Sequence, residues 1–316
     1  MDVRSGENAS SHGTSGRVLL SGASGMLGRA IAAALRRRNV ELLTLVRRKP
    51  NAPNELEWAP EAGRIAEPSR LEGLDAVIHL SGANVSTHRW TTAYKREIGT
   101  SRVSSTRTLA TSLAGLNRKP VTFISASATG YYGNRGDVLL DESSPSGKGF
   151  FPELCMAWEA AAESAQMAGI RVVHPRIGVV LGHGGMLDKL APIFRLGLGG
   201  RLGDGHQWIS WISEADLVAA ILFVLDRPAL TGAINFVAPE PITNAGFTRE
   251  LADALHRPAI FPAPALALRL AFGEMADEAL LASVRVMPAR LLAEGFRFAY
   301  PAAELAIRAA LSTKTS

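Results

Sequence analysis

The stretch that decides the fold reads Gly22-Ala23-Ser24-Gly25-Met26-Leu27-Gly28. An apolar run at residues 17–21 precedes it and is typical of a short buried strand, and residues 26–38 follow with the apolar spacing of a helix. Glycines let the backbone turn tightly and approach a diphosphate, and the helix N-terminus offers free N–H groups to it. The stretch therefore predicts dinucleotide binding, and the alternative is an ordinary strand-to-helix turn.

The second predicted strand, residues 41–46, ends at Val46 and is followed by Arg47 and Arg48. In dinucleotide-binding folds this strand end lies beside the adenosine ribose, where an acidic residue favours NAD and a basic residue accommodates the 2′-phosphate of NADP. No acidic residue occurs here, and a guanidinium group can bind a phosphate through two hydrogen bonds. We therefore predict NADP as the cofactor, with a solvated basic loop as the alternative.

Strands and helices alternate at least five times between residues 17 and 182. The strand at residues 75–80 ends in Ser81 and Gly82, whose small size lets the backbone run close under a cofactor. This alternation predicts an α/β fold with a Rossmann-type, doubly wound parallel sheet. We expect residues 17–182 to form the NADP-binding domain and residues 183–316 to form a smaller C-terminal α/β part on the substrate side. A strand near residues 233–237 should return to the main sheet.

The composition of the 316 residues narrows the functional class. The net charge is +5, but no long Lys/Arg run or aromatic-basic interleaving occurs, so we do not expect nucleic-acid binding. The longest apolar run, residues 217–225, is too short to cross a bilayer, and residues 1–16 have the polar composition of a disordered tail. The single cysteine excludes an internal disulfide and suits the cytoplasm, and the seven histidines form no close pair that predicts a metal site.

Motifs along the whole chain resemble one family, the epimerase-like branch of the extended short-chain dehydrogenases/reductases. That branch carries an extra C-terminal domain of unknown function, and its members are often labelled sugar-nucleotide epimerase-like. The likeness covers residue 17 to the C-terminus. It rests on the segments Arg89-Trp90-Thr91, Ser125-Ala126-Ser127, Gly130-Tyr131-Tyr132-Gly133, Trp158-Glu159-Ala160-Ala161, Gly178-Val179-Val180-Leu181-Gly182, residues 194–200, residues 203–212 and residues 272–277.

The resemblance implies which residues hold the cofactor. Besides the glycine turn, the implied contacts are Val46, Arg47, Leu80, Ser81, Glu97, Arg102 and Val180. Arg102 also makes sense as a phosphate partner on chemical grounds, and a surface ion pair with Glu97 or Asp75 is the alternative. The family usually has Trp-Ile-His where this chain has Trp211-Ile212-Ser213, which puts a pocket role for position 213 in doubt.

Catalytic members of the superfamily use a serine with a Tyr-x-x-x-Lys pair on the following helix. Here Cys155 occupies the tyrosine position and Glu159 the lysine position, one helical turn apart. A carboxylate raises the pKa of a neighbouring thiol, whereas the usual lysine lowers that of the tyrosine. We therefore interpret Cys155 as a small buried hydrophobe, and we predict Ser127, Tyr132 and Glu159 as the residues that carry any catalysis.

The segment around residues 203–211 is the predicted substrate side. His206, Gln207, Trp208 and Trp211 could hold a polar ligand, such as a nucleotide sugar, by hydrogen bonds and ring stacking, although tryptophans are as often core residues. Two functions remain open. The first is an NADP-dependent oxidoreductase or epimerase with an altered acid/base set. The second is an NADP(H)-binding sensor or interaction protein without turnover. An apolar helix pair would also suit a homodimer.

Overall fold

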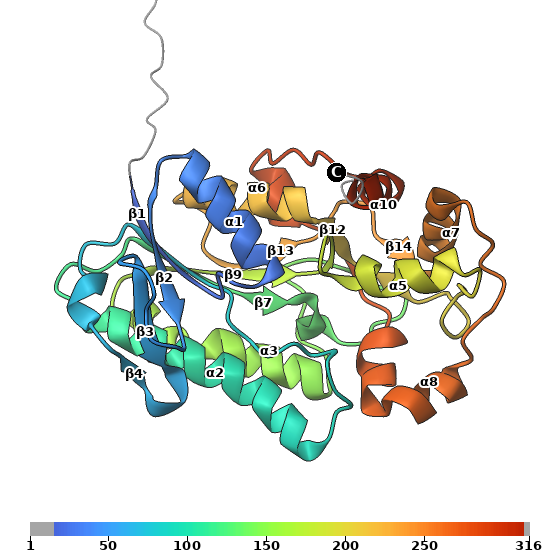
Figure 1. Cartoon of the computed structure of the whole chain (residues 1–316), viewed down its shortest axis with the longest axis horizontal. Coiled ribbons are helices and arrows are strands. Elements are labelled where there is room, and N and C mark those ends of the chain that lie inside the picture. Colours follow the sequence, from blue (N-terminus) through green and yellow to red (C-terminus); the bar gives the residue numbers. More distant parts are fainter. Residues whose placement is uncertain (1–15, 313–316) are drawn as a thin grey trace, which may run out of the picture.

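A sheet of nine strands forms the centre of the molecule in the computed structural model, which describes residues 16–312 (Figure 1). The strand order is β13-β9-β6-β5-β1-β2-β3-β4, and β7 pairs with β9. The pairs are parallel except for β3 with β4. Residues 1–15 of the tail predicted at residues 1–16 lie outside the described residues. The strands of this sheet are β1 (Arg17–Ser21), β2 (Glu41–Val46), β3 (Glu55–Ala59), β4 (Arg64–Ile65), β5 (Ala76–His79), β6 (Thr122–Ser125), β7 (Ser127–Ala128), β9 (Arg171–Ile177) and β13 (Gly232–Phe236).

Helices cover both faces of this sheet (Figure 1). One face packs against α1 (Met26–Arg37) and α6 (Glu214–Leu225), and the other against α2 (Thr92–Ala114), α3 (Phe150–Ala160) and α4 (Glu163–Met167). Side chains alternate along a strand, so in β1 Val18 and Leu20 face the first layer while Leu19 faces the second. A parallel strand covered on both sides reads as an unbroken apolar run, as residues 18–20 do.

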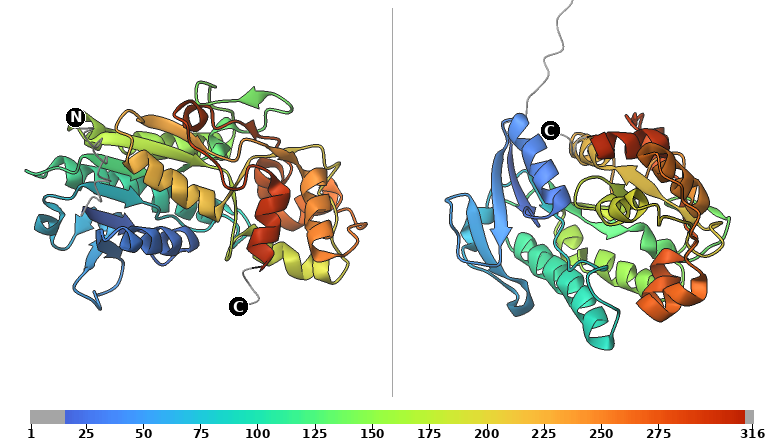
Figure 2. Two further views of the ribbon diagram at one scale, coloured as in Figure 1. Left: turned by 90° about the horizontal axis from the view of Figure 1, so that it is seen from above. Right: turned by 45° about the vertical axis from the view of Figure 1, so that its right-hand side comes forward.

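The C-terminal part lies at the carboxyl end of the sheet. Its helices α5 (Met186–Arg195), α7 (Asn244–Leu255) and α10 (Ala303–Ser312) share one apolar cluster, and they gather at one end of the molecule with α8 (Ala265–Phe272) (Figure 2). Three small strand pairs complete it. They are β10 (Val179–Leu181) with β12 (Trp211–Ser213), β11 (Trp208–Ile209) with β14 (Ile242–Thr243), and β8 (Leu139–Leu140) with β15 (Arg285–Val286). A π-helical turn (Ala276–Leu280) and α9 (Ala289–Ala293) lie on either side of β15 in the sequence.

The observed architecture is the predicted one, an α/β fold with a doubly wound and largely parallel sheet. The strand expected near residues 233–237 is β13, which pairs in parallel with β9 at the edge of the main sheet. Within residues 16–312, no helix combines the length and apolar character that a bilayer crossing requires. The carboxyl ends of β1, β5, β7 and β9 meet at one edge of the sheet, where an open α/β fold places its ligands.

Candidate functional site

The glycine turn joins β1 to α1, and its geometry explains why glycines stand there. Gly22 has a φ of +72°, and a side chain at Gly28 would overlap the carbonyl oxygen of Gly22 at 2.1 Å. The turn is closed by the Gly25 N–H, which donates to the Gly22 carbonyl at 3.0 Å. Gly25 is the N-cap of α1 without a side-chain capping bond, and no acidic residue stands in the first turn. The helix start therefore offers uncapped N–H groups and a positive dipole end to an anion.

The end of β5 forms the neighbouring wall. A side chain at Gly22 would lie 3.0 Å from the backbone of Leu80, which places the strand end directly against the turn. Segment 180–185 also borders the turn, because Gly184 and Gly185 lie against Met26 at the start of α1. Val180, on β10, is half-buried. The predicted cofactor residues of the turn, of residues 80–82 and at Val180 thus come from three parts of the chain to one place.

Arg102 of α2 is a largely buried cation beside this wall. Its guanidinium carbon would lie 3.1 Å from a side chain at Gly82, and burial lowers the pKa of Arg102 below its usual value. Within residues 16–312, it pairs with neither Glu97, which is exposed, nor Asp75, which accepts from the Arg17 N–H. Its hydrogen bond goes to the Ile98 carbonyl at 3.2 Å. The guanidinium also lies over the Trp158 ring, 5.1 Å from its centroid, and it has no carboxylate partner among residues 16–312, so it can pair with a phosphate.

The two arginines after β2 differ in what they contact. Arg48 donates two hydrogen bonds, of 2.6 and 2.8 Å, to the carboxylate of Glu55. This contact lowers the pKa of Glu55 to about 2, mainly through the Arg48 hydrogen bonds. Arg47 is exposed and has no hydrogen-bond or ion-pair partner in the described part of the chain. Of the two residues predicted at the 2′-phosphate, Arg47 is the one whose guanidinium is free.

At the carboxyl end of the sheet, Ser127 and Glu159 lie in contact. The Ser127 hydroxyl donates to Glu159 Oε1 at 2.6 Å. Arg176 donates from Nε to Oε1 and from Nη2 to Oε2, both at 2.9 Å. Burial alone would lower the pKa of Arg176, but the Glu159 carboxylate raises it above its usual value. The result is a fixed carboxylate whose oxygens face a hydroxyl and a guanidinium.

Arg176 is a site residue that the sequence reasoning missed. It stands directly opposite Ser127 in the parallel pairing of β7 with β9. Its guanidinium also lies over the Tyr131 ring, 3.4 Å from the centroid. A charged residue inside the apolar run of residues 172–177 was a usable signal, because lone charges are rarely buried without a partner.

Cys155 is buried next to this carboxylate. Its Sγ donates weakly to the Ala128 carbonyl at 3.7 Å. Burial, followed by the charge of Glu159, raises the pKa of Cys155 to about 12. A neutral, enclosed thiol packs as a small hydrophobe and is neither a base nor a nucleophile at neutral pH.

Tyr132 does not face an open pocket, contrary to its predicted catalytic place. Its side chain is fully buried, its hydroxyl donates to Asn235 Oδ1 at 2.7 Å, and Arg176 Nη1 donates to that hydroxyl at 3.1 Å. Burial raises the pKa of Tyr132 to about 12. The phenol is committed to positioning Arg176, and the more exposed ring of Tyr131 covers the guanidinium.

The structure separates the four predicted substrate residues. Trp211 has no exposed surface and its ring N–H donates to the Glu240 carbonyl, so we correct its expected stacking role to core packing. Gln207 is likewise buried, and its amide donates to the carbonyls of Leu202 and Leu280. The His206 side chain is 87% exposed beside Asp204. Of the four predicted substrate residues, Trp208 is the one that has a partly exposed ring.

Trp208 lies between two polar partners. Its ring N–H donates to Asp137 at 2.8 Å, and the Arg285 guanidinium lies 4.3 Å from the ring centroid. Position 213, where the resembling family usually has a histidine, holds a serine that caps α6. The Ser213 hydroxyl accepts from the Asp216 N–H at 2.9 Å, so the residue has a clear local role.

Comparisons with known proteins agree with this fold. A model of the NAD dependent epimerase/dehydratase family matches residues 18–236, and a model of a domain of unknown function, DUF1731, matches residues 263–310. An epimerase family protein of Mycobacterium bovis is 44% identical over 282 residues, which are 89% of this chain and 93% of that protein. Human epimerase family protein SDR39U1 is 37% identical over 290 residues, 90% of this chain and 96% of that protein.

A solved structure is similar over nearly the whole length of the chain. The crystal structure of human epimerase family protein SDR39U1 with NADPH has a TM-score of 0.85 at 33% identity. The match covers 94% of this chain and 99% of that one.

Proposed function

Because the chain belongs to the NAD-dependent epimerase/dehydratase family and is an epimerase-like short-chain dehydrogenase/reductase of the extended type, we propose that it is an NADP-dependent enzyme. The proposed activity is oxidoreduction or epimerisation of a small polar substrate that carries a hydroxyl or carbonyl group. The observation that carries the proposal is the contact of 2.6 Å between the Ser127 hydroxyl and the Glu159 carboxylate at the carboxyl edge of the sheet.

Cofactor choice rests on the residues around the turn. The relative from human was solved with NADPH, and in this chain the unpaired Arg47 has the chemistry to bind a 2′-phosphate. The uncapped start of α1 and the buried Arg102 would serve the diphosphate. NADP, when bound, supplies the acceptor or donor of a hydride at its nicotinamide ring.

Proton transfer is the work left to the protein. Ser127 is buried, as Tyr132 is, but its hydroxyl donates to Glu159 and its oxygen keeps a lone pair for a substrate hydroxyl that reaches the carboxyl edge of the sheet. When the substrate O–H bond breaks, its proton passes to Ser127 Oγ and the Ser127 proton passes to Glu159 Oε1. Reduction of a carbonyl runs the same two transfers backwards. Arg176 fixes the orientation of the carboxylate through two hydrogen bonds.

A second candidate function is favoured by Cys155. The position that carries the catalytic tyrosine in active members holds a neutral thiol with a pKa of about 12, which cannot replace the phenol. A protein that binds NADP(H) without turnover would tolerate this change. The two candidates share a cofactor site and differ in whether Ser127 and Glu159 move a proton.

The experiment is a turnover screen on NADPH-loaded protein, using nucleotide sugars and small aldehydes and ketones and following the reduced nicotinamide by absorbance. We expect a substrate whose kcat falls about 100-fold or more in Ser127→Ala and in Glu159→Gln, the range usual for loss of general acid–base catalysis. Met156→Ala, at an exposed position of α3, is the matched control and should keep its kcat. Tight NADPH binding with no turnover across the panel would reject the enzyme and favour the sensor.

A further inference from the structure

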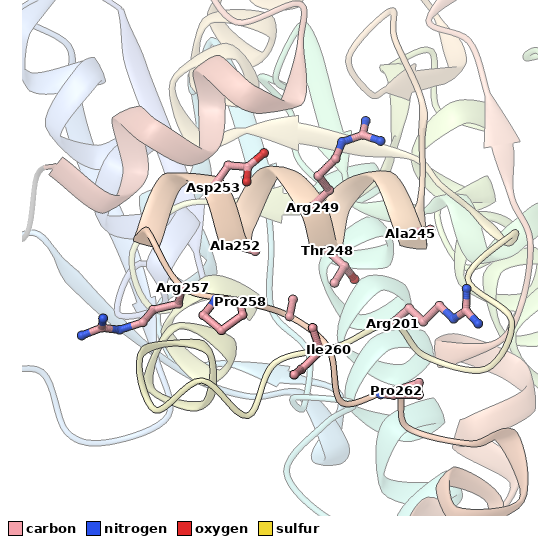
Figure 3. A pocket seen from close by; sticks show the side chains of 11 residues that line it. Arg201, Ala245, Thr248, Arg249, Ala252, Asp253, Arg257, Pro258, Ile260 and Pro262 are labelled. Atoms are coloured by element: carbon pink, nitrogen blue, oxygen red, sulfur yellow. The ribbon is translucent and has the colours of Figure 1, made fainter.

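A cavity of about 460 Å³ lies in the C-terminal part, between α7 and the chain that follows this helix (Figure 3). Helix α7 forms one wall, and residues 257–262 form the opposite one. Small and apolar side chains of both walls line the cavity, including Ala252 of α7 and Pro258 and Ile260 of the opposite wall, with Thr248 on the α7 side. The volume falls in the range of pockets that hold a ligand group.

Positive charge surrounds this cavity. Arg201, Arg249 and Arg257 line it, against a single carboxylate, that of Asp253. Figure 3 shows Arg257 at one end of the cavity and Arg201 at the other. Arg201 has no side-chain hydrogen bond or ion pair within residues 16–312, and Arg257 donates to a neutral carbonyl, that of Arg195. Two exposed guanidinium groups, one at each end, are therefore available to an occupant with negative charges.

Large apolar side chains continue the surface beyond the cavity. Leu196 is 76% exposed, Leu198 56%, Ile260 70% and Phe261 55%. Ile260 lines the cavity and directly precedes Phe261, whose N–H pairs with the Gly199 carbonyl next to Leu198, so these apolar residues border the cavity. An exposed apolar patch with a charged border commonly marks an interaction site.

Backbone hydrogen bonds join the segments at residues 199–201 and 261–263. The Phe261 N–H donates to the Gly199 carbonyl at 3.1 Å, and the Ala263 N–H donates to the Arg201 carbonyl at 2.8 Å. The two segments approach so closely that a side chain at Gly200 would overlap the Phe261 carbonyl. Phe261 is thus held on paired backbone, with Leu198 and Ile260 directly beside the pairing, which lowers the entropy cost of binding.

We propose that this surface binds an acidic peptide segment of a partner protein. An apolar side chain of that segment fills the cavity beside Ile260, and Asp or Glu residues on either side of it pair with Arg201 and Arg257. Charge complementarity selects this occupant. A second copy of the chain would bring arginines against arginines across a two-fold axis. Two other occupants fit less well. A lipid surface would not fill the cavity, and a small anion would not cover the exposed leucines.

The test uses a random twelve-residue peptide library displayed on phage and selected on the immobilised full chain. Enriched sequences should combine Asp or Glu with Leu, Ile or Phe. A synthetic peptide of the enriched sequence, fluorescently labelled, is then titrated by anisotropy. We expect its affinity to fall about tenfold or more in Arg201→Glu/Arg257→Glu, to fall in Ile260→Ser, and to weaken as salt is raised.

The matched control is Arg37→Glu/Arg64→Glu, which reverses two exposed charges on the far side of the molecule and should change the affinity less than about twofold. Thermal melting and NADPH titration verify that every variant is folded. Four results would overturn the proposal. The first two are a selection without enrichment of acidic residues and equal peptide binding by the wild type and the Arg201→Glu/Arg257→Glu variant. The third is Arg201-dependent sedimentation with phosphatidylglycerol vesicles in place of peptide binding. The fourth is a dimer, detected by light scattering, that Ile260→Ser dissociates.

Discussion

Arg176 donates one hydrogen bond of 2.9 Å to each carboxylate oxygen of Glu159, and together they form the best-buried ion pair of residues 16–312. Their side chains are 5% and 14% exposed. Taking both charges out of water costs free energy that their attraction repays only while both are present. The pair therefore gives the site a fixed geometry, and its loss affects stability in a way that depends on which partner is removed.

Removing the cation alone should destabilise the protein most. In Arg176→Met, Glu159 keeps its charge without a counter-charge, and we expect the free energy of unfolding to fall by about 3–5 kcal/mol. The double variant Glu159→Leu/Arg176→Met removes both charges and should recover most of that loss. Urea unfolding measures both effects. Equal destabilisation in the single and double variants would contradict this account and point to lost packing on Tyr131.

Arg47 and Arg48 provide an adjacent pair of variants for the cofactor. Arg47→Ala should weaken NADPH binding by roughly 1–3 kcal/mol, the value of a charge-assisted contact to a phosphate, and leave NADH binding unchanged. Arg48→Ala should affect NADPH less, because Arg48 is held by Glu55. Calorimetric titration with NADPH and with NADH measures the affinity of each variant for both nucleotides. A larger effect for Arg48 than for Arg47 would move the 2′-phosphate site to the second arginine.

The fold could be predicted from the sequence because local signals and long-range packing agree. The glycine turn, the apolar strand of residues 17–21 and the spacing of the first helix each indicate the same unit, and its repetition forces a parallel sheet. The family resemblance is confirmed by the matches over residues 18–236 and 263–310.

The site could be predicted only in part, because side-chain roles depend on neighbours that are distant in sequence. Ser127 and Glu159 do meet, but Arg176 joins them only through the strand register that sets it opposite Ser127. Nothing local distinguishes Arg47 from Arg48 until Glu55 is seen to bind the second. A tryptophan in a loop-rich segment fits a ligand platform or a core equally well, and Trp211 is core.

Cys155 should resist alkylation in the folded protein. Its pKa, raised by burial to about 12, leaves almost no thiolate at pH 8, whereas an ordinary cysteine is partly ionised there. We expect iodoacetamide labelling roughly a thousandfold slower than that of a free thiol, with full labelling in urea. Mass spectrometry after timed exposure gives the rate. Labelling as fast as that of a free thiol would show that the thiol is open to solvent and would reopen a chemical role for it.

Stability in mild acid should depend on His79, which lies under the cofactor wall. Its ring bonds Ser21 Oγ at 2.6 Å and Ser105 Oγ at 3.1 Å, and burial lowers its pKa to about 3. In the unfolded chain this histidine is protonated below about pH 6.5, whereas in the folded protein it stays neutral down to about pH 3. It therefore contributes stability above pH 6.5, and this stability is lost as the pH falls toward 3. The loss is about 1.4 kcal/mol for each pH unit in that window.

His79→Gln keeps hydrogen-bonding capacity and removes the titration. Urea unfolding at pH 7 and at pH 5 gives the loss in the free energy of unfolding between these two pH values. We expect this loss to be about 2 kcal/mol smaller in the variant than in the wild type. The buried His174, whose pKa burial also lowers, titrates in both proteins and cancels in the comparison. His206→Gln, at an exposed position, is the control and should keep the wild-type fall. An identical pH dependence in His79→Gln and wild type would mean that the folded protein protonates His79 readily, and that the wall beneath Leu80 opens to water.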